Sequence, residues 1–438
     1  MKRGMKMDDR FPRSAWFRKD RFGMFIHWGL YAIPARGEWV RSPERLTVEQ
    51  YQQYFDTFDP VDYDPKKWAR AAKDAGMKYA VMTAKHHDGF CLFDSKLTGY
   101  KATNTPAGRD LIAQYVDAFR AEGLGVGLYY SLIDWRHPEY PHYGDRQHPM
   151  RDCEAFKGAK HEFNKYIDYM HGQVRELCTN YGKIDIMWFD FSYDDMSGEK
   201  WQAEKLIRMI RELQPDMLID NRLEASGDGF GSIIDDEPSP WSGDFASPEQ
   251  IIPPEGITDK RGRPIPWEAC VTMNTNWGYH SGDKHFKPAP VIIRKLVECV
   301  SKGGNMLMNV GPDARGNIPD ESLGILADIG RWMRKNSASI YGCGNAGLPK
   351  PEWGRYTAAG NTVYAHVFEP PIGPLHLPGI ARERVKYIRL LSDKSEIKLS
   401  SDWMTNAYKG QTFANTHHLT HDCALPDLTD TVIEITLD

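Results

Sequence analysis

Seven short apolar segments recur along the first 310 residues of the chain, and most of them end on polar or aromatic residues. They span residues 22–28, 79–84, 125–131, 184–190, 216–221, 268–274 and 305–310. Their length and their β-branched and aromatic residues are typical of buried strands. Helical patterns lie between several of them, such as residues 163–181, where apolar residues recur at spacings of three and four. Strands that alternate with helices predict a parallel sheet.

An eighth strand would close such a sheet into a barrel, and the glycine-flanked residues 232–235 are the candidate. We therefore predict an α/β chain with an irregular (β/α)8 barrel over residues 1–342. After residue 342 the pattern changes, because the remaining apolar segments lack a helical stripe. These segments are residues 361–368, 384–391, 396–400 and 431–437. They predict a small antiparallel β-sandwich domain over residues 343–438, and a length of 438 residues agrees with two domains.

The composition argues against nucleic-acid and membrane partners. The chain is 41% hydrophobic and 26% charged, and its net charge of −5 is modest for this length. No apolar segment is long enough to span a bilayer, and residues 1–18 lack the apolar core of a signal peptide. We expect a cytoplasmic protein, or a periplasmic or secreted one if a signal was trimmed. Seven scattered cysteines predict reduced buried thiols and no structural zinc.

Polar side chains follow the predicted strands at His27, His86, His87, Tyr130, Asp190 and Arg222. The carboxyl ends of barrel strands meet at one mouth, so these side chains should lie close together. Asp190 is a candidate nucleophile or general base, with an N-cap of a following helix as the alternative. Histidines interleaved with aromatic residues favour a neutral polyol, which needs hydrogen bonds and an aromatic platform. His86 and His87 are also candidate metal ligands, but no further ligand lies at a supporting spacing, so we expect no metal and no cofactor.

Eight segments, in one order across the predicted barrel, resemble the family-29 α-L-fucosidases. They are Arg21-Phe-Gly-Met-Phe-Ile-His-Trp-Gly29, Lys85-His-His-Asp-Gly-Phe90, Tyr129-Tyr-Ser131, Trp188-Phe-Asp190, Asn221-Arg222, Gly243-Asp-Phe-Ala-Ser-Pro-Glu249, Trp277-Gly-Tyr279 and Lys302-Gly-Gly-Asn-Met-Leu-Met-Asn-Val-Gly-Pro312. Each segment alone is weak, but eight in order are highly specific. The C-terminal part resembles the family only in being a β domain after the barrel.

The resemblance implies a retaining exo-α-L-fucosidase that releases terminal L-fucose from fucosylated oligosaccharides or glycoconjugates. It implies that Asp190 is the nucleophile and Glu249 the acid/base. It also implies a sugar-binding set of His27, Glu38, Trp39, His86, His87, Tyr130, Trp188, Arg222 and Trp277. One departure concerns Phe191, because the family commonly has glycine after the nucleophile, and a phenyl ring there would reshape the pocket wall.

Several alternatives remain open at this stage. Asp244, five residues before Glu249, is a second candidate for the acid/base. Glu268 is disfavoured because it begins a predicted strand, and the active sites of barrel enzymes lie at the opposite, carboxyl ends of the strands. A related exo-glycosidase, such as an α-L-galactosidase-like enzyme, is the nearest functional alternative. A non-catalytic carbohydrate-binding protein is disfavoured because both candidate carboxyls are present. A metal-dependent hydrolase and a homo-oligomeric state also stay open.

Overall fold

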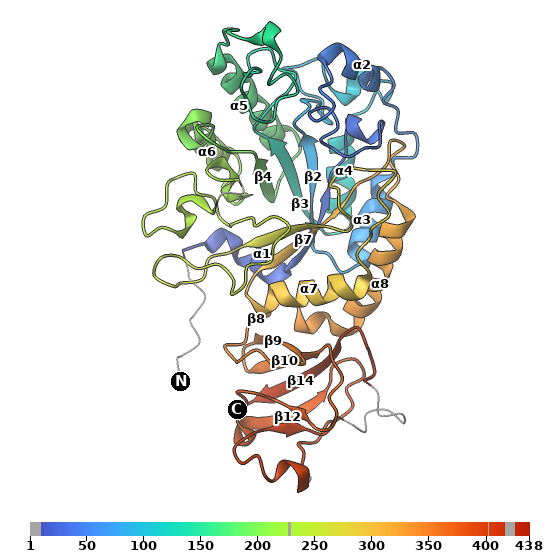
Figure 1. The fold of residues 1–438 in the computed structure, drawn as a ribbon, viewed down its shortest axis with the longest axis vertical. Helices are drawn as coiled ribbons and strands as arrows, with labels where there is room; N and C mark the ends of the chain where they lie inside the picture. Colours follow the sequence, from blue (N-terminus) through green and yellow to red (C-terminus); the bar gives the residue numbers. More distant parts are fainter. Residues whose placement is uncertain (1–9, 227–228, 402, 417–424) are drawn as a thin grey trace.

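The computed structural model describes residues 10–226, 229–401, 403–416 and 425–438 (Figure 1). Seven parallel strands form one curled sheet in the order β5-β4-β3-β2-β1-β7-β6. Their bounds are β1 (Phe22–Ile26), β2 (Tyr79–Lys85), β3 (Gly125–Ser131), β4 (Ile186–Asp190), β5 (Leu218–Ile219), β6 (Glu268–Thr272) and β7 (Asn305–Val310). Each strand lies within or nearly within a predicted apolar segment, although β5 is much shorter than residues 216–221.

The gap between β5 and β6 is filled by residues 244–249, so the predicted eighth strand at residues 232–235 is wrong. Parallel bridges join Asp220 to Phe245, Ala246 to Trp267 and Glu249 to Cys270. Pro248 has no N–H to donate, which limits this segment to isolated bridges. Residues 231–234 form a 3-10 helix instead. The N–H and the hydroxyl of Ser232 both donate to the Glu224 carboxylate, at 2.8 Å each, and hold that turn locally.

Side chains from all eight positions fill the interior of the barrel. They are Phe25, Tyr79, Val81, Tyr129, Ile186, Trp188, Leu218, Phe245, Cys270 and Leu307. Phe245 comes from the irregular segment, so that segment contributes to the interior like a strand. Neighbouring residues on the same strands, such as Met24 and Tyr130, pack with the larger core that includes the helices. This alternation decides which side chains can reach the mouth of the barrel.

Helices surround the barrel (Figure 1). They are α1 (Ala15–Asp20), α2 (Val48–Asp56), α3 (Pro65–Asp74), α4 (Leu111–Ala121), α5 (Phe163–Asn180), α6 (Ala203–Leu213), α7 (Ala289–Ser301) and α8 (Asp320–Asn336). The start of α3 agrees with the sequence pattern, because the Asp64 side chain accepts from the N–H of Lys66 and Pro65 is the first helical residue. Within the described residues, no helix has both the length and the apolar character needed to cross a membrane.

The C-terminal strands are antiparallel and form a sandwich. One sheet has the order β12 (Val385–Leu390), β14 (Thr431–Leu437), β10 (Thr362–Val367), β9 (Gly354–Ala359) and β8 (Gly344–Asn345), and a second pairs β11 (Leu375–His376) with β13 (Phe413–Ala414). Residues of both sheets, among them Val363, Leu375 and Ala414, share one apolar core. In Figure 1 the larger sheet lies beneath α7. The division between residues 342 and 343 stays our proposal.

The predicted strand at residues 396–400 is wrong. The N–H of Ile397 donates to the carbonyl of Ile388 in β12, at 2.9 Å, whereas the N–H of Ser400 donates to the carbonyl of Phe413 in β13, at 2.8 Å. The segment therefore crosses from one sheet to the other and pairs regularly with neither.

The cysteines agree in part with the prediction of buried thiols. The six cysteines within the described ranges are free; Cys153 is half-buried, and the other five are buried. Cys423 lies outside the described residues.

Candidate active site

One small pocket, of about 60 Å³, opens at the carboxyl ends of the strands. Its lining residues are Phe25, His27, Glu38, Trp39, His86, His87, Tyr129, Trp188, Asp190, Phe191, Glu249, Cys270 and Trp277. Every predicted site residue is among them except Tyr130 and Arg222. The fold therefore brings together side chains that are more than 200 positions apart in the sequence, as the convergence of barrel strands predicts.

Arg222 joins the two candidate catalytic carboxylates. Its Nη1 donates to Oδ1 of Asp190 at 2.7 Å, and its Nη2 donates to Oε2 of Glu249 at 3.0 Å. Because both nitrogens belong to one planar guanidinium, the two carboxylates lie beside each other. Arg222 is 3% exposed, and both the hydroxyl and the carbonyl of Ser247 accept from it. The guanidinium also lies over the Trp188 ring, 4.6 Å from its centroid. Arg222 is thus held from several sides.

Burial is the main influence on the protonation of Asp190. It raises the pKa of this carboxyl to about 6, while the charge of Arg222 lowers the pKa, the charge of Glu249 raises it, and a hydrogen bond from the Tyr129 hydroxyl, at 2.8 Å, lowers it. The contacts with Arg222 and Tyr129 both favour the ionised form of Asp190. A carboxylate that is desolvated but ionised can act as a nucleophile.

Tyr130 does not reach the pocket, and its neighbour Tyr129 takes its place. Tyr129 is in register with Trp188 on β4, and both side chains point into the barrel. Tyr130 points the other way, and its hydroxyl donates to Oε1 of Gln173 on α5, at 2.7 Å. Both faces of β3 are buried, so the sequence carries no polar alternation that would separate the two tyrosines. Phe25 could have been found from His27, because residues two apart on a strand share a face.

Glu38 and Phe191 both line the wall of the pocket, but their conformations are stabilised in different ways. Glu38 is 6% exposed, and its Oε2 accepts from the N–H of Gly278 at 2.8 Å, which anchors the loop that carries Trp277. Burial raises the pKa of Glu38. Phe191 has a φ of 75°, a left-handed conformation that glycine adopts at lower cost. Its ring lies 5.2 Å from the Trp39 ring, between centroids, and it lines the pocket as expected from its position after Asp190.

Three buried histidines line the same pocket. The ring centroids of His86 and His87 lie 3.9 Å apart, and the His27 ring lies 5.0 Å from the Trp277 ring. Burial lowers the pKa of each imidazole, that of His27 to about 3, so all three are neutral at pH 7. Neutral imidazoles both donate and accept hydrogen bonds, as recognition of sugar hydroxyls requires. Within the described parts of the chain, no group of three or more His, Cys, Asp or Glu side chains is arranged to hold a metal ion.

The competing carboxyls lie outside the pocket. Asp244 accepts from Nη2 of Arg211 at 2.6 Å and from the N–H of Ile219 at 3.0 Å. These contacts tie its side chain to α6 and β5. Glu268 is the first residue of β6, at the end of the barrel away from the pocket, and it is fully buried. The hydroxyl of Tyr79 donates to it.

Glu268 should make the stability of the protein depend on pH. Burial raises its pKa from 4.5 to about 8, although a hydrogen bond from Tyr79 lowers it. Between these values the folded protein keeps a proton that the unfolded chain has lost, so the free energy of unfolding should fall as the pH rises from about 5 to 8. Relative to Glu268→Gln, the change is at most about 1.4 kcal/mol per pH unit.

Urea titrations of both proteins at several pH values measure this difference. The control variant Glu352→Gln replaces an exposed glutamate, and its free energy of unfolding should depend on pH as that of the wild type does. Equal pH dependence in wild type and Glu268→Gln would show that Glu268 is ionised in the folded state.

Comparison with known proteins assigns the family. A sequence model described as alpha-L-fucosidase matches residues 3–338. The chain belongs to the α-L-fucosidase family. The structure of α-L-fucosidase isoenzyme 1 from Paenibacillus thiaminolyticus is 61% identical to it, with a TM-score of 0.95 and coverage of 98% of this chain and 100% of that one. The tissue α-L-fucosidase of Homo sapiens is 28% identical over 424 residues, which is 90% of this chain and 84% of that protein.

A third relative carries mechanistic information. It is a family-29 α-L-fucosidase from Bacteroides thetaiotaomicron, whose structure holds a trapped covalent intermediate with 2-fluoro-fucosyl fluoride in a glutamate-to-glutamine mutant. It is 30% identical, with a TM-score of 0.81 and coverage of 100% of this chain and 98% of that one. The solved structures of family-29 α-L-fucosidases combine a (β/α)8 barrel with a C-terminal β-sandwich, and this chain has the same architecture.

Proposed function

We propose that this chain is a retaining exo-α-L-fucosidase that releases terminal L-fucose from fucosylated oligosaccharides or glycoconjugates. The observation that carries this proposal is the pair of carboxylates, Asp190 and Glu249, joined by Arg222 at the mouth of a barrel of the α-L-fucosidase family. A retaining glycosidase needs two carboxyl groups on either side of the scissile bond, close enough that no water fits between the nucleophile and the sugar. The small size of the pocket favours a single terminal sugar ring over the middle of a chain.

Asp190 is the proposed nucleophile. Its carboxylate attacks the anomeric carbon, the glycosidic C–O bond breaks, and a fucosyl ester forms. Arg222 and Tyr129 orient the carboxylate through the hydrogen bonds described above. A covalent intermediate has been trapped in the Bacteroides thetaiotaomicron relative, which supports the same two-step reaction here.

Glu249 is the proposed acid/base. It protonates the oxygen of the leaving group in the first step, and in the second step it removes a proton from the water that hydrolyses the fucosyl ester. Its side chain is 41% exposed, so it lies on the open side of the pocket, where the leaving group departs. Asp244 lacks this access because it is paired with Arg211. In the Bacteroides thetaiotaomicron relative the intermediate was trapped in a glutamate mutant, which also favours a glutamate.

The remaining pocket residues are proposed to recognise the sugar. His27, His86 and His87 offer hydrogen bonds to hydroxyl groups, while Trp188 and Trp277 offer aromatic faces to the C–H side of the ring. Trp39 and Phe191 pack together and form another wall. The family match and the relatives support this activity over the α-L-galactosidase-like alternative.

The purified protein should hydrolyse an aryl α-L-fucoside, and the rate should not change after dialysis against EDTA. The reason is that both proposed catalytic groups are carboxylates of the chain itself. NMR of the first-formed sugar should show α-L-fucose, because two displacements restore the configuration. The matched aryl α-L-galactoside is the comparison substrate. Faster hydrolysis of the galactoside would overturn the substrate assignment, and initial β-L-fucose would overturn the double displacement.

A further inference from the structure

We propose that Asn309 and Ser131 are positioning residues that keep His27 and His87 in the tautomer with the proton on Nδ1. Nε2 of each ring then presents a lone pair to the pocket, where it accepts a hydrogen bond from a substrate hydroxyl. The identity of the hydroxyl-bearing ligand rests on the proposed function, but the tautomers are a property of the free protein.

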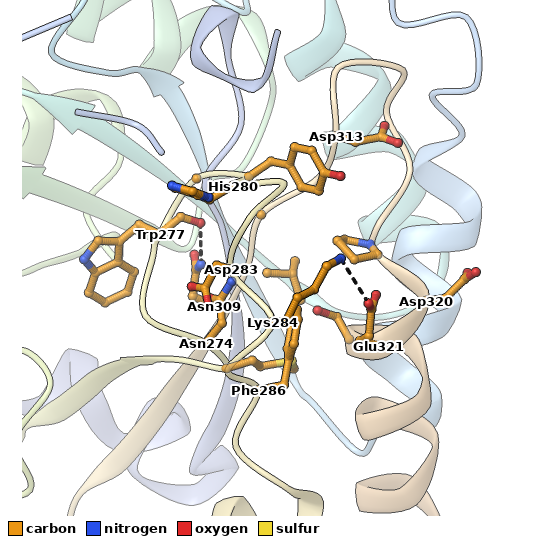
Figure 2. A pocket seen from close by; sticks show the side chains of 17 residues that line it. Asn274, Trp277, His280, Asp283, Lys284, Phe286, Asn309, Asp313, Asp320 and Glu321 are labelled. Carbon is orange, nitrogen blue, oxygen red and sulfur yellow. Dashed lines mark hydrogen bonds and ion pairs between the residues drawn. The ribbon is translucent and has the colours of Figure 1, made fainter. Parts of the chain in front are cut away.

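The tautomer of His27 follows from the backbone carbonyl of Trp277. This carbonyl can only accept, and it lies 2.7 Å from Nδ2 of Asn309 (Figure 2). The Asn309 amide group must therefore point its NH₂ at Trp277, which leaves its Oδ1 facing Nδ1 of His27 at 2.7 Å. An amide oxygen cannot donate, so His27 Nδ1 must carry the proton. The opposite orientation of the amide would place two oxygens against each other.

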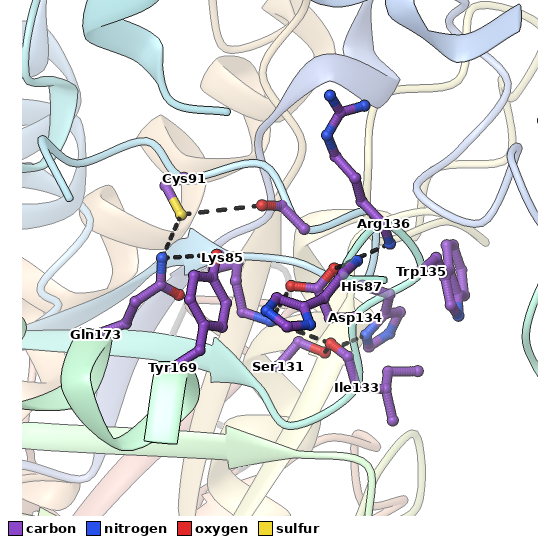
Figure 3. Close-up of polar contacts among 12 residues, drawn as sticks. Lys85, His87, Cys91, Ser131, Ile133, Asp134, Trp135, Arg136, Tyr169 and Gln173 are labelled. Atoms are coloured by element: carbon purple, nitrogen blue, oxygen red, sulfur yellow. Dashed lines mark hydrogen bonds and ion pairs between the residues drawn. The ribbon is translucent and has the colours of Figure 1, made fainter. Parts of the chain in front are cut away.

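The tautomer of His87 follows from the backbone carbonyl of Ile133 in the same way. Oγ of Ser131 lies 2.9 Å from this carbonyl, and its single proton must lie between the two oxygens. Ser131 has no second proton, so at its 2.7 Å contact with Nδ1 of His87 it can only accept (Figure 3). His87 Nδ1 therefore donates, and its Nε2 is left without a proton in the neutral ring.

A buried ion pair holds the Ile133 carbonyl in place. Nζ of Lys85 donates to this carbonyl at 3.2 Å and to Oδ2 of Asp134 at 3.3 Å (Figure 3). Neither Lys85 nor Asp134 is more than 1% exposed. The acceptor that orients Ser131 is therefore itself fixed by charged groups that water does not screen.

The two acceptor atoms face the pocket without protein partners. Both rings line the pocket, and among the described residues no hydrogen bond to Nε2 of His27 or His87 is formed. Burial lowers the pKa of both rings, so the lone pairs are not protonated near pH 7. His86 differs, because its buried Nδ1 has no hydrogen-bond partner that would select a tautomer. The pocket thus requires two hydroxyl donors from its ligand.

Nitrogen NMR of the ¹⁵N-histidine-labelled free protein tests the tautomers directly. We expect His27 and His87 to show the pattern of a proton on Nδ1 and an unprotonated Nε2 at pH 7, with assignment by the variants below. A proton on Nε2 of either ring would overturn the proposal for that ring. No substrate is needed, so this outcome is independent of the proposed function.

Two variants serve as controls for each other. Asn309→Ala should change the tautomer signals of His27 and leave those of His87 unchanged, and Ser131→Ala should do the reverse. Ser131→Thr keeps the hydroxyl and should restore the His87 signals. Changed signals of both rings in each variant would point to general disturbance of the fold and would overturn the assigned roles. If one of these variants does not fold, His27→Gln or His87→Gln, each of which removes the signals of one ring, assigns the wild-type spectrum instead.

Deoxy and deoxyfluoro analogues of L-fucose test the acceptor role. Fluorine accepts hydrogen bonds weakly but never donates, so replacing a contacted hydroxyl by fluorine should weaken competitive inhibition roughly 10-fold or more. Replacement of that hydroxyl by fluorine should weaken inhibition at least as much as its replacement by hydrogen. If the deoxyfluoro analogue inhibits better than the deoxy analogue at a contacted position, the histidine donates the hydrogen bond, and the proposal is overturned. If the protein does not hydrolyse the aryl α-L-fucoside, the proposed function fails, while NMR still decides the tautomers.

Discussion

Replacing Asp190 by glycine or alanine should lower kcat on every α-L-fucoside by about 10⁴-fold or more, because no fucosyl ester can then form. Activated and natural substrates should be affected alike, since bond breaking and ester formation occur in the same step. Steady-state kinetics on an aryl fucoside and on a fucosylated oligosaccharide measure the loss. Azide should enter the vacated space and give β-fucosyl azide, with inverted configuration.

Asp194→Asn is the matched control for this experiment. Asp194 follows the same strand, but its contact is with Arg146, and it does not line the pocket. We expect kcat/KM within about twofold of wild type for this variant. Substantial turnover by Asp190→Gly without added azide would contradict the nucleophile assignment.

Replacing Glu249 by alanine should have an effect that depends on the leaving group. An activated dinitrophenyl fucoside needs little acid assistance, so its first step should stay close to the wild-type rate. Natural oligosaccharides should lose roughly 10²–10⁴-fold, the usual contribution of general acid–base catalysis. Azide should speed turnover by attacking the accumulated fucosyl ester, and the product should be α-fucosyl azide.

Asp244→Asn is the control that separates the two candidate acids. The structure pairs Asp244 with Arg211, so this variant should lower the midpoint of thermal unfolding and keep the wild-type ratio of activities on activated and natural substrates. If Asp244→Asn shows the leaving-group dependence and the azide rescue, and Glu249→Ala shows neither, then Asp244 is the acid/base and Glu249 is not. The opposite configurations of the azide products from Asp190 and Glu249 variants provide an independent check.

The sequence alone was sufficient to locate the seven parallel strands. Each is a short apolar segment buried on both faces, and the polar residues that follow it mark the end at the mouth of the barrel. That local pattern is why Asp190 and the three histidines could be grouped from the sequence. The ordered motifs extended the grouping to Glu249 and Trp277, which lie on irregular segments without a periodic pattern.

Tertiary structure decided the remaining features, because they depend on contacts that leave no local pattern. The closing segment at residues 244–249 contains Pro248 and takes its place only from β5 and β6 on either side. The choice of Tyr129 over Tyr130 depends on which face of β3 turns inward, and burial of both faces hides that choice in the sequence.

The contact of Arg222 with both Asp190 and Glu249 likewise joins three segments that only the closed barrel brings within hydrogen-bonding distance. The same is true of the histidine tautomers, since the atoms that select them are backbone carbonyls. A backbone carbonyl is present at every residue, so the sequence cannot distinguish those of Trp277 and Ile133 from any other. The sequence thus determined the strands and most of the chemical groups at the mouth of the barrel, and the tertiary structure decided the remaining groups and how all of them are paired, oriented and protonated.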